Sequence, residues 1–459
     1  MASIQELERL GATQRPTVPQ IARAVHGAAT VVLAAIVIVR VAERMEGPSL
    51  PLAVASGAAV CGVLALALAR FEWAVGLGFV LLPFVRVEPA PADVVLAIVM
   101  AVALVTHRVG LRRVPLGIFL LLGAFVLLNL VSTVEAIDPR RALVYFAITV
   151  YLIGLAIWLT NFVDSPRRAR VVVGSYTLGA VVIAIATLAA LSLPLPSLDV
   201  LVYAVGEGGE RGQGLFKDPN VFGPFLIPPA LILLEEAFGE GLMIRRRVVA
   251  GSFSLILMIA VVFAYSRATW LSLALGVVTM FVVFALRRGG GDRAFGLLVV
   301  LLGAVGLVTA VMVVSSSVNF FHERARFQQY DTSRFGAQAS GAELATSHPL
   351  GLGPGQFELV SDTSAHSLYV RSLAEQGVTG AAIIVALVLL TLLLAARNAV
   401  EGNDTYGIHS AALLGAWVGI AANSGFIDTL HWRHFWVVAA LIWIGATSHA
   451  STRVGTEVP

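Results

Sequence analysis

Long apolar runs recur along the whole chain, and they constrain its fold more than any other feature. Each run of about 17–25 apolar residues is long enough to cross a bilayer core as one helix. Of the 459 residues, 58% are hydrophobic and only 13% are charged, which is not the composition of a soluble globular domain. A transmembrane β-barrel would show alternation instead of solid apolar blocks. The sequence therefore predicts an all-α polytopic membrane protein.

The apolar runs predict about 12–14 transmembrane helices. The expected spans lie near residues 24–42, 50–69, 72–85, 91–106, 115–133, 141–163, 171–193, 220–238, 248–265, 267–286, 294–315, 367–396, 406–424 and 434–449. We divide the chain into an N-terminal segment (1–23), a first transmembrane bundle (24–193), a second transmembrane region (194–450) and a tail (451–459).

Basic residues gather in short arginine clusters between the apolar runs: "HRVGLRR", "DSPRRAR", "MIRRR" and "LRRGGGDR". Cytoplasmic loops of membrane proteins carry an excess of Lys and Arg. Counting the spans alternately places these clusters and both termini in the cytoplasm. The net charge of +3 is therefore interpreted as a topology signal, and no nucleic-acid partner is expected. Cys61 is the single cysteine, so it cannot form an intrachain disulfide, and it reads as a small packed residue.

Two connections on the predicted outer side are long. One joins Ser192 to Asn220, and the other, roughly residues 316–366, is too long to be a simple connector. The second is expected to hold short amphipathic helices on the membrane face, "VNFFHERARFQQY" and "GAQASGAELATS", followed by the turn-rich "HPLGLGPGQF".

Four polar stretches are expected at this outer face, where cations oppose the positive-inside rule and need a reason. They are "GERGQGLFKDPNVFG" with Arg211, Lys217, Asp218 and Asn220, "YSRATW" with Arg267, "SRFGAQASGAELATSHPLGLGPGQF" with Arg334, His348 and Gln356, and "SDTSAHSLYVRSLAEQGVTG" with His366, Tyr369, Arg371 and Glu375. The arginines predict an anion site, and the anion most available at that depth is a lipid-linked phosphate or diphosphate. The planar guanidinium fork binds phosphate oxygens in pairs and stays ionised.

A glycosyl transfer from such a carrier also needs a base for the acceptor hydroxyl. His366 follows Ser364, which we expect to cap the next helix, and would lie in its first turn. The helix dipole there, together with nearby arginines, favours a neutral imidazole that can accept a proton.

Simpler explanations exist for several of these residues. Arg371 and Glu375, spaced i, i+4, could simply pair with each other, and Asn220 could be a helix N-cap. Other residues could serve turns, caps or an interfacial aromatic belt instead of a site: Lys217, Asp218, His348, Gly351, Gly353, Gly355, and His431, Arg433 and His434 of "FIDTLHWRHFW".

The segments "GLFKDPNVFG", "YSRATWLSLALG", "RFGAQASGAELATSHPLGLGPGQF" and "AHSLYVRSLAEQGVTG" resemble, in this order, the signatures of the O-antigen ligase and polymerase family. The resemblance covers roughly residues 205–395, and the last two segments are the specific ones. Two positions depart from the family pattern: Gln338 stands where many members have tryptophan, and Ser367 where many have asparagine.

The resemblance implies a GT-C-like membrane glycosyltransferase that needs no metal or other cofactor. It would move a glycan from an undecaprenyl-like diphosphate carrier to a glycan, glycolipid or protein acceptor, at the outer face of a bacterial cytoplasmic membrane. His366 matches the family's essential histidine, and Arg267 the arginine of its Ser-Arg pair. Arg211 and Arg334 match two further arginines of the family. Arg371 is counted with the diphosphate ligands, and Asn220, Tyr369, Glu375 and Gln356 as supporting residues.

Two other functions stay open. A transporter or flippase for a lipid-linked glycan or small anion would carry charges at mid-bilayer on broken helices, and Pro228 and Pro229 are the one candidate break. A peptidoglycan polymerase of the cell-shape type would use a carboxylate in the long outer loop. That loop offers Glu323, Asp331, Glu343, Glu358 and Asp362, none of them in a recognisable motif.

Overall fold

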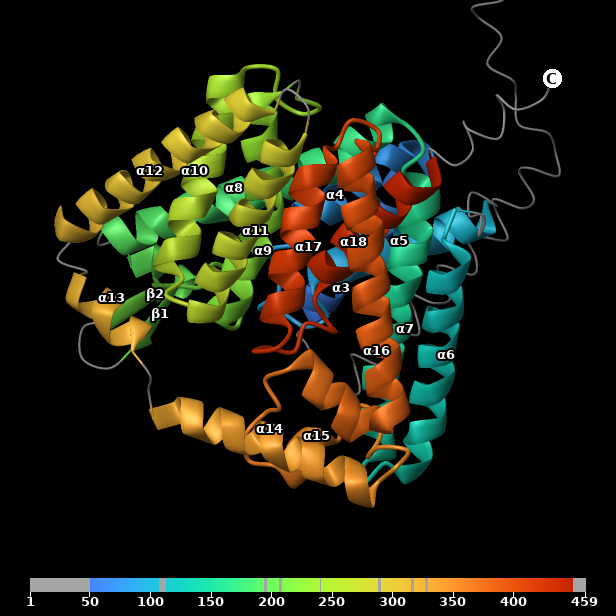
Figure 1. The fold of residues 1–459 in the computed structure, drawn as a ribbon. Helices are drawn as coiled ribbons and strands as arrows, with labels where there is room; N and C mark the ends of the chain where they lie inside the picture. The colour runs from blue at the N-terminus through green and yellow to red at the C-terminus, as the bar shows by residue number, and fades with distance from the viewer. Residues whose placement is uncertain are drawn as a thin grey trace, which may run out of the picture.

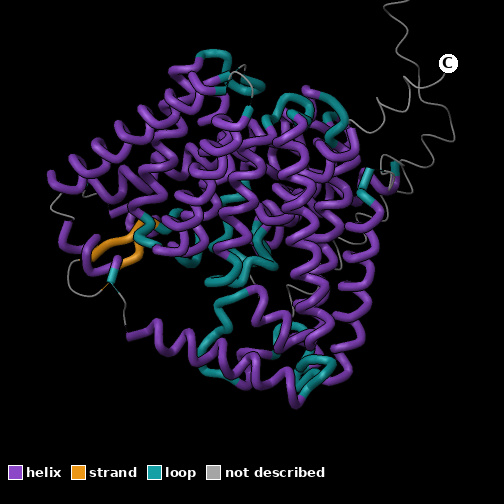
Figure 2. The backbone as a smooth tube through the Cα atoms, viewed as in Figure 1, coloured by secondary structure: helices purple, strands orange, loops and turns teal. Residues whose placement is uncertain are grey.

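The protein is a bundle of helices with one long helix lying across its lower end in the view of Figure 1. The computed structural model describes residues 50–106, 113–193, 196–205, 209–239, 241–287, 290–314, 318–326 and 329–448. The expected first span (24–42), the N-terminal segment (1–23) and the tail (451–459) lie outside the described residues. Helices dominate the described chain (Figure 2), which confirms the prediction of an all-α polytopic fold.

Every expected span from residue 50 onward coincides with a helix. The first region contributes α3 (Leu50–Ala69), α4 (Phe71–Val80), α5 (Pro91–Val105), α6 (Leu116–Ser132), α7 (Pro139–Phe162) and α8 (Pro166–Ser192). The second contributes α9 (Pro219–Phe238), α10 (Arg247–Phe263), α11 (Arg267–Leu286), α12 (Gly291–Val314), α16 (Leu368–Glu401), α17 (Ser410–Asn423) and α18 (Arg433–Ser448). Among the described residues, six helices are long and apolar enough to cross a membrane: α6, α7, α8, α9, α11 and α16. Several of the other apolar helices are shorter.

Helix α9 is the most buried of these six, with 83% of its apolar window inside the protein. It packs against α10, α11 and α17. Pro228 and Pro229 lie inside it, yet the helix continues from Pro219 to Phe238. The proline pair, the one candidate break for a transporter, therefore does not interrupt the helix, because packing against its neighbours holds the helix together where its own hydrogen bonds are missing.

The two long connections are folded. The first connection forms a 3₁₀ helix, η2 (Pro196–Leu201), followed by a short antiparallel hairpin of β1 (Val202–Val205) and β2 (Gly209–Gly212). The second forms α13 (Val318–Ala325), α14 (Gln329–Ser347) and α15 (Phe357–Val360), so both helices expected there exist, and α14 is longer than its predicted segment. A 3₁₀ turn, η1 (Thr133–Glu135), follows α6.

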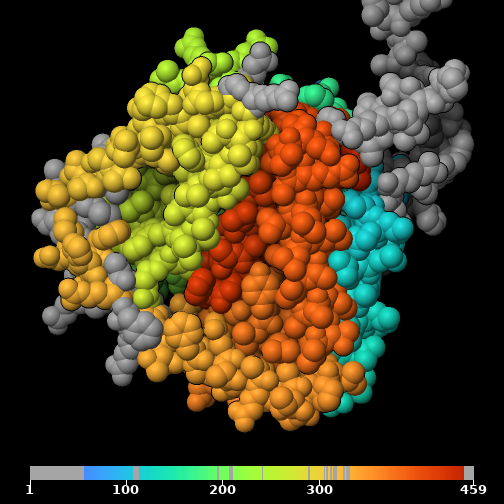
Figure 3. Space-filling view, viewed as in Figure 1, coloured from blue at the N-terminus to red at the C-terminus, as the bar shows by residue number. Residues whose placement is uncertain are grey.

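Helix α14 and the loop after it cover the lower end of the face seen in Figure 3. We call this the α14 end of the bundle; α7, α9, α11 and α16 all begin there.

Helix α16 is interrupted near its start, a feature that the sequence did not suggest. Gly377 has φ 69° and ψ −173°, which separates a first segment from the long apolar one. The turn-rich loop fits into this break: Leu352 and Gly353 donate backbone hydrogen bonds to the carbonyls of Ala374 and Glu375, both 2.9 Å. A Cβ at position 377 would lie 2.0 Å from the Pro349 carbonyl oxygen, so only glycine allows this contact.

Candidate functional site

A cavity of about 240 Å³ lies at the α14 end, between the first turn of α11, α14 and the loop after α17. Its walls are Arg267, Ala268, Leu271, Asp331, Arg334, Phe335, Gln338 and Phe426. Two arginines of the expected anion site, Arg267 and Arg334, thus share one cavity with apolar side chains.

Arg267 is held by the loop that covers it. Its Nη2 donates to both carboxylate oxygens of Asp331, at 2.6 and 2.8 Å, and its Nη1 donates to the Arg326 carbonyl at 2.9 Å. Asp331 is buried. The Ser-Arg pair therefore anchors α14 to the body of the protein, and part of the guanidinium fork is already occupied by a carboxylate.

Arg334 and Gln338, one turn apart on α14, connect the same helix to the loop after α17. Arg334 Nη2 donates to the Phe426 carbonyl at 2.8 Å. Gln338 Nε2 lies 3.3 Å from the His366 carbonyl and 3.4 Å from that of Gly425. Gln338, which replaces the tryptophan common in the family pattern, therefore docks α14 through polar contacts.

His366 lies just before α16 and not in its first turn. Ser367 caps the helix by accepting from the Val370 amide, whereas His366 has a left-handed backbone with φ 45°. The expected cap at Ser364 is wrong, because that hydroxyl contacts Glu358 and Arg371 instead. The left-handed residue turns the chain into α16 and separates the ring from the helix that follows.

The surroundings of His366 lower the pKa of its ring and so favour the neutral form. Partial burial lowers the pKa of the imidazole below its usual value, and the positive charge of Arg334 lowers it further. Asp218 and Asp428 oppose this shift. The sequence predicted a lowered pKa from the helix dipole and from nearby arginines; burial contributes most to the shift, and the guanidinium of Arg334 contributes as well.

Arg211 comes from β2 and is buried beside the turn between α10 and α11. Its Nε donates to the Ala264 carbonyl at 3.0 Å, and its Nη2 donates to Asn220 Oδ1 at 3.1 Å. Ala264 lies three residues before Arg267, so one turn brings two of the expected arginines to the same end. Asn220 is not the N-cap of α9; Asp218 is, accepting from the Asn220 amide at 2.8 Å.

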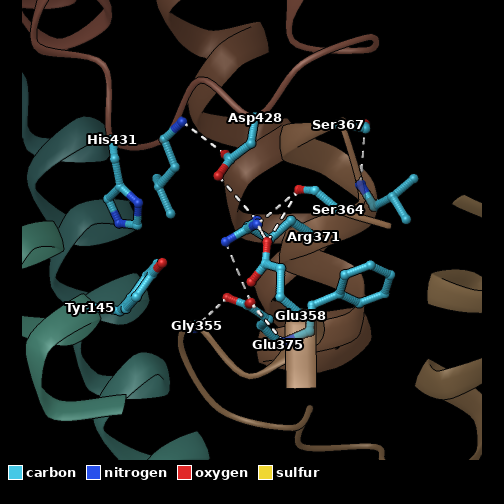
Figure 4. A network of polar contacts seen from close by, with 12 residues as sticks. Tyr145, Gly355, Glu358, Ser364, Ser367, Arg371, Glu375, Asp428 and His431 are labelled. Atoms are coloured by element: carbon cyan, nitrogen blue, oxygen red, sulfur yellow. Dashed lines mark hydrogen bonds and ion pairs between the residues drawn. The ribbon is translucent and has the colours of Figure 1, made fainter. Parts of the chain in front are cut away.

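Arg371 is the centre of a buried ion cluster (Figure 4). Its side chain is 6% exposed and lies 3.6 Å from Glu375 and 3.1 Å from Asp428, and it also pairs with Glu358. Three carboxylates around one guanidinium repel any further anion. This environment argues against the expected contact between Arg371 and a diphosphate, and it explains the residue as a structural centre.

Glu375 and Gln356 hold the glycine-rich loop in place. Glu375 accepts from the amides of Gly355 and Phe357 at 2.9 and 3.2 Å. Gln356 accepts from the Asp138 amide at 2.8 Å and donates back to its carbonyl at 3.2 Å, which joins the loop to the start of α7. Both side chains therefore fix the conformation of the loop.

Three other polar residues named from the sequence each contact a residue from a distant part of the chain. Tyr369 donates to the Ala421 carbonyl at 3.0 Å. Arg433 Nε donates to Asp93 at 2.6 Å, and His431 contacts Thr149 and the edge of Tyr145. Burial lowers the pKa of His431 to about 4. In the part of the chain that the structure describes, no cluster of His, Cys, Asp or Glu suited to a metal ion was found.

The sequence analysis missed Asp428, and it named Asp331 and Glu358 only as loop carboxylates without a motif. Each of the three pairs with an arginine of the expected site. The sequence offered one hint of these pairs: acidic residues occur in segments that were expected at the same membrane level as the arginines.

The fold and this site define a polytopic α-helical membrane protein that gathers several arginines and a histidine of lowered pKa at one end of its bundle. A family model described as O-antigen ligase, Wzy_C, matches residues 252–401. The match supports assignment of the chain to the O-antigen ligase and polymerase family, in agreement with the resemblance of the motifs, and implies glycosyl transfer in general terms. It contains Arg267, Arg334 and His366 but not Arg211. No curated protein matches the chain.

Proposed function

We propose that this protein transfers a glycan from a polyprenyl diphosphate carrier to an acceptor hydroxyl, at the outer face of a bacterial cytoplasmic membrane. The observation that carries the proposal is His366, whose backbone carbonyl lies 3.3 Å from Gln338 of a cavity wall that also holds Arg267 and Arg334, and whose pKa the charge of Arg334 helps to lower. The acceptor would be a glycan, a glycolipid or a protein.

The reaction would be a single displacement. The neutral ring of His366 accepts the proton of the acceptor hydroxyl, and the freed oxygen attacks the anomeric carbon of the donor sugar. The bond from that carbon to the diphosphate oxygen breaks, and its electron pair leaves with the diphosphate. Because the attack comes from the opposite face, the anomeric configuration inverts. Arginines placed near the leaving group stabilise the charge that develops on it.

Arg334, Arg267 and Arg211 would share the diphosphate. Of these three arginines, Arg267 already donates through its Nη2 to a carboxylate, that of Asp331. A bound diphosphate would have to share that guanidinium with the carboxylate or displace it. Arg211 would act from the α10–α11 turn, where Asn220 and the Ala264 carbonyl fix its orientation.

The structure gives less support to the two rival functions. The proline pair of α9 does not break that helix, and the break in α16 receives the loop that follows α14. Of the loop carboxylates, Asp331 and Glu358 pair with arginines, so their oxygens are engaged and poorly placed to accept a proton.

The test is a transfer assay with the purified protein, a lipid diphosphate donor and an acceptor glycan. His366→Ala should lower turnover by at least about 100-fold, the usual contribution of a general base. His366→Asn should do the same while tolerating the left-handed backbone at this position. The matched control is His322→Ala, at an exposed histidine on α13. Near-normal turnover of both His366 variants would remove the proposed base.

A further inference from the structure

A second pocket lies at the opposite end of the bundle, where α9 ends and α10 begins (upper left in Figure 1). Its volume is about 680 Å³, and its walls are Arg170, Gly239, Gly241, Leu242, Met243, Arg245 and Arg247. Three of these seven residues are arginines, and the proposed transfer reaction uses none of them.

The walls of this pocket are held in place without a ligand. The carboxylate of Glu236 accepts from the amides of Met243 and Ile244 at 3.0 and 3.1 Å. Gly241 permits the tight turn, because a Cβ there would lie 2.2 Å from the Ile244 carbonyl oxygen. The segment from Gly241 to Ile244 is therefore fixed from inside the protein.

Two of the arginines are also oriented. Arg170 Nε donates to the Leu242 carbonyl at 2.8 Å, and Arg247 Nε donates to the Gly239 carbonyl at 3.2 Å. Each bond uses Nε, and the two terminal nitrogens of Arg170 and Arg247 make no hydrogen bond or ion pair within the described residues. The side chain of Arg245 makes none there either. A guanidinium fixed through Nε can offer its end-on pair of N–H groups to two oxygens of one anion.

The described residues of this pocket carry an excess of positive charge. Glu236, a carboxylate behind the wall, is 1% exposed and already accepts from two amides. The described lining residues thus include three arginines and no carboxylate.

We propose that this pocket binds a phosphate group through Arg170, Arg245 and Arg247. Phosphate suits planar, permanently charged donors better than a carboxylate does, because it presents several oxygens to several forks at once. The group could belong to an anionic phospholipid headgroup, since the pocket lies at the end of membrane-spanning helices, or to free phosphate.

The experiment measures thermal unfolding of the full chain in a neutral detergent. The probes are inorganic phosphate, compared with chloride at equal ionic strength, and short-chain phosphatidylglycerol, compared with the matching diacylglycerol. A ligand that binds the folded state raises the unfolding temperature, and the rise grows with the ratio of ligand concentration to Kd. Stabilisation by free phosphate assigns a soluble ligand, and stabilisation by the lipid alone assigns a headgroup.

Arg245→Gln is the decisive variant, because this side chain makes no hydrogen bond or ion pair within the described residues. Its loss should therefore leave the fold intact. It should weaken binding of the active probe roughly tenfold, the effect of losing one charged hydrogen-bonding group. Arg246→Gln is the matched control: Arg246 is the adjacent exposed arginine, and it does not line the pocket. The proposal fails if neither probe stabilises the protein beyond its control, or if both variants weaken binding equally.

Discussion

Replacing Arg371 with alanine separates a structural role for this residue from a role in binding the donor. The change removes the cation that lies among Glu358, Glu375 and Asp428. Breaking a buried ion pair costs about 3–5 kcal/mol, because the remaining charge stays buried without its partner.

The lower end of that range applies here. Glu358 keeps a second arginine, Arg141, at 3.2 Å, and Glu375 keeps two backbone amides. Asp428 is 17% exposed and reaches some water. We therefore expect Arg371→Ala to lower the free energy of unfolding by about 3 kcal/mol.

The assay is thermal unfolding in detergent, together with the KM for the lipid donor measured on the folded fraction. Arg397→Ala is the control, because Arg397 lies on the same helix and also pairs with a glutamate four residues on, but is 60% exposed. An exposed pair contributes less than about 1 kcal/mol. If Arg371→Ala unfolds like the control while the donor KM rises, the residue binds substrate and the structural explanation is wrong.

Two further predictions follow from the same end of the bundle. Arg334→Gln removes a positive charge that lowers the pKa of His366. The pKa of His366 should therefore rise, and the acidic limb of the pH profile of kcat/KM should move to higher pH. An unchanged limb would show that Arg334 does not act on the base. Gly377→Ala puts a Cβ 2.0 Å from the Pro349 carbonyl oxygen at φ 69°, and should destabilise the protein by about 1–3 kcal/mol. Gly123→Ala, where a Cβ meets nothing within 4 Å, should be neutral or slightly stabilising in the same unfolding measurement.

The helices could be predicted because each span is encoded locally. A run of apolar residues of membrane length needs no partner to be recognised, and α7, α8 and α11 lie close to their expected bounds. The break at Gly377 could not be predicted in this way. It depends on the carbonyl of Pro349, which folding brings to the glycine from 28 residues earlier in the chain, and no local pattern reports such a contact.

The caps show the same limit on a smaller scale. Ser364 and Ser367 are equally good cap residues from sequence alone. The structure distinguishes them because Glu358 and Arg371 engage Ser364, while Ser367 is left to accept from the Val370 amide. Because Ser367 is the cap, His366 lies outside the helix, and its lowered pKa comes first from burial and then from the charge of Arg334.

His366 and Arg371 illustrate why one motif can hold two unlike roles. Both are polar residues near the start of α16, and the sequence motif predicts a part in binding or catalysis for both. The structure surrounds Arg371 with carboxylates from α15, α16 and the loop after α17, whereas His366 has carboxylates and a guanidinium that act on its charge from a distance. A group whose charge is matched by buried partners stabilises the fold, and a half-buried group with a shifted pKa is better suited to chemistry. The number and sign of the partners, which come from distant parts of the chain, therefore separate the two residues.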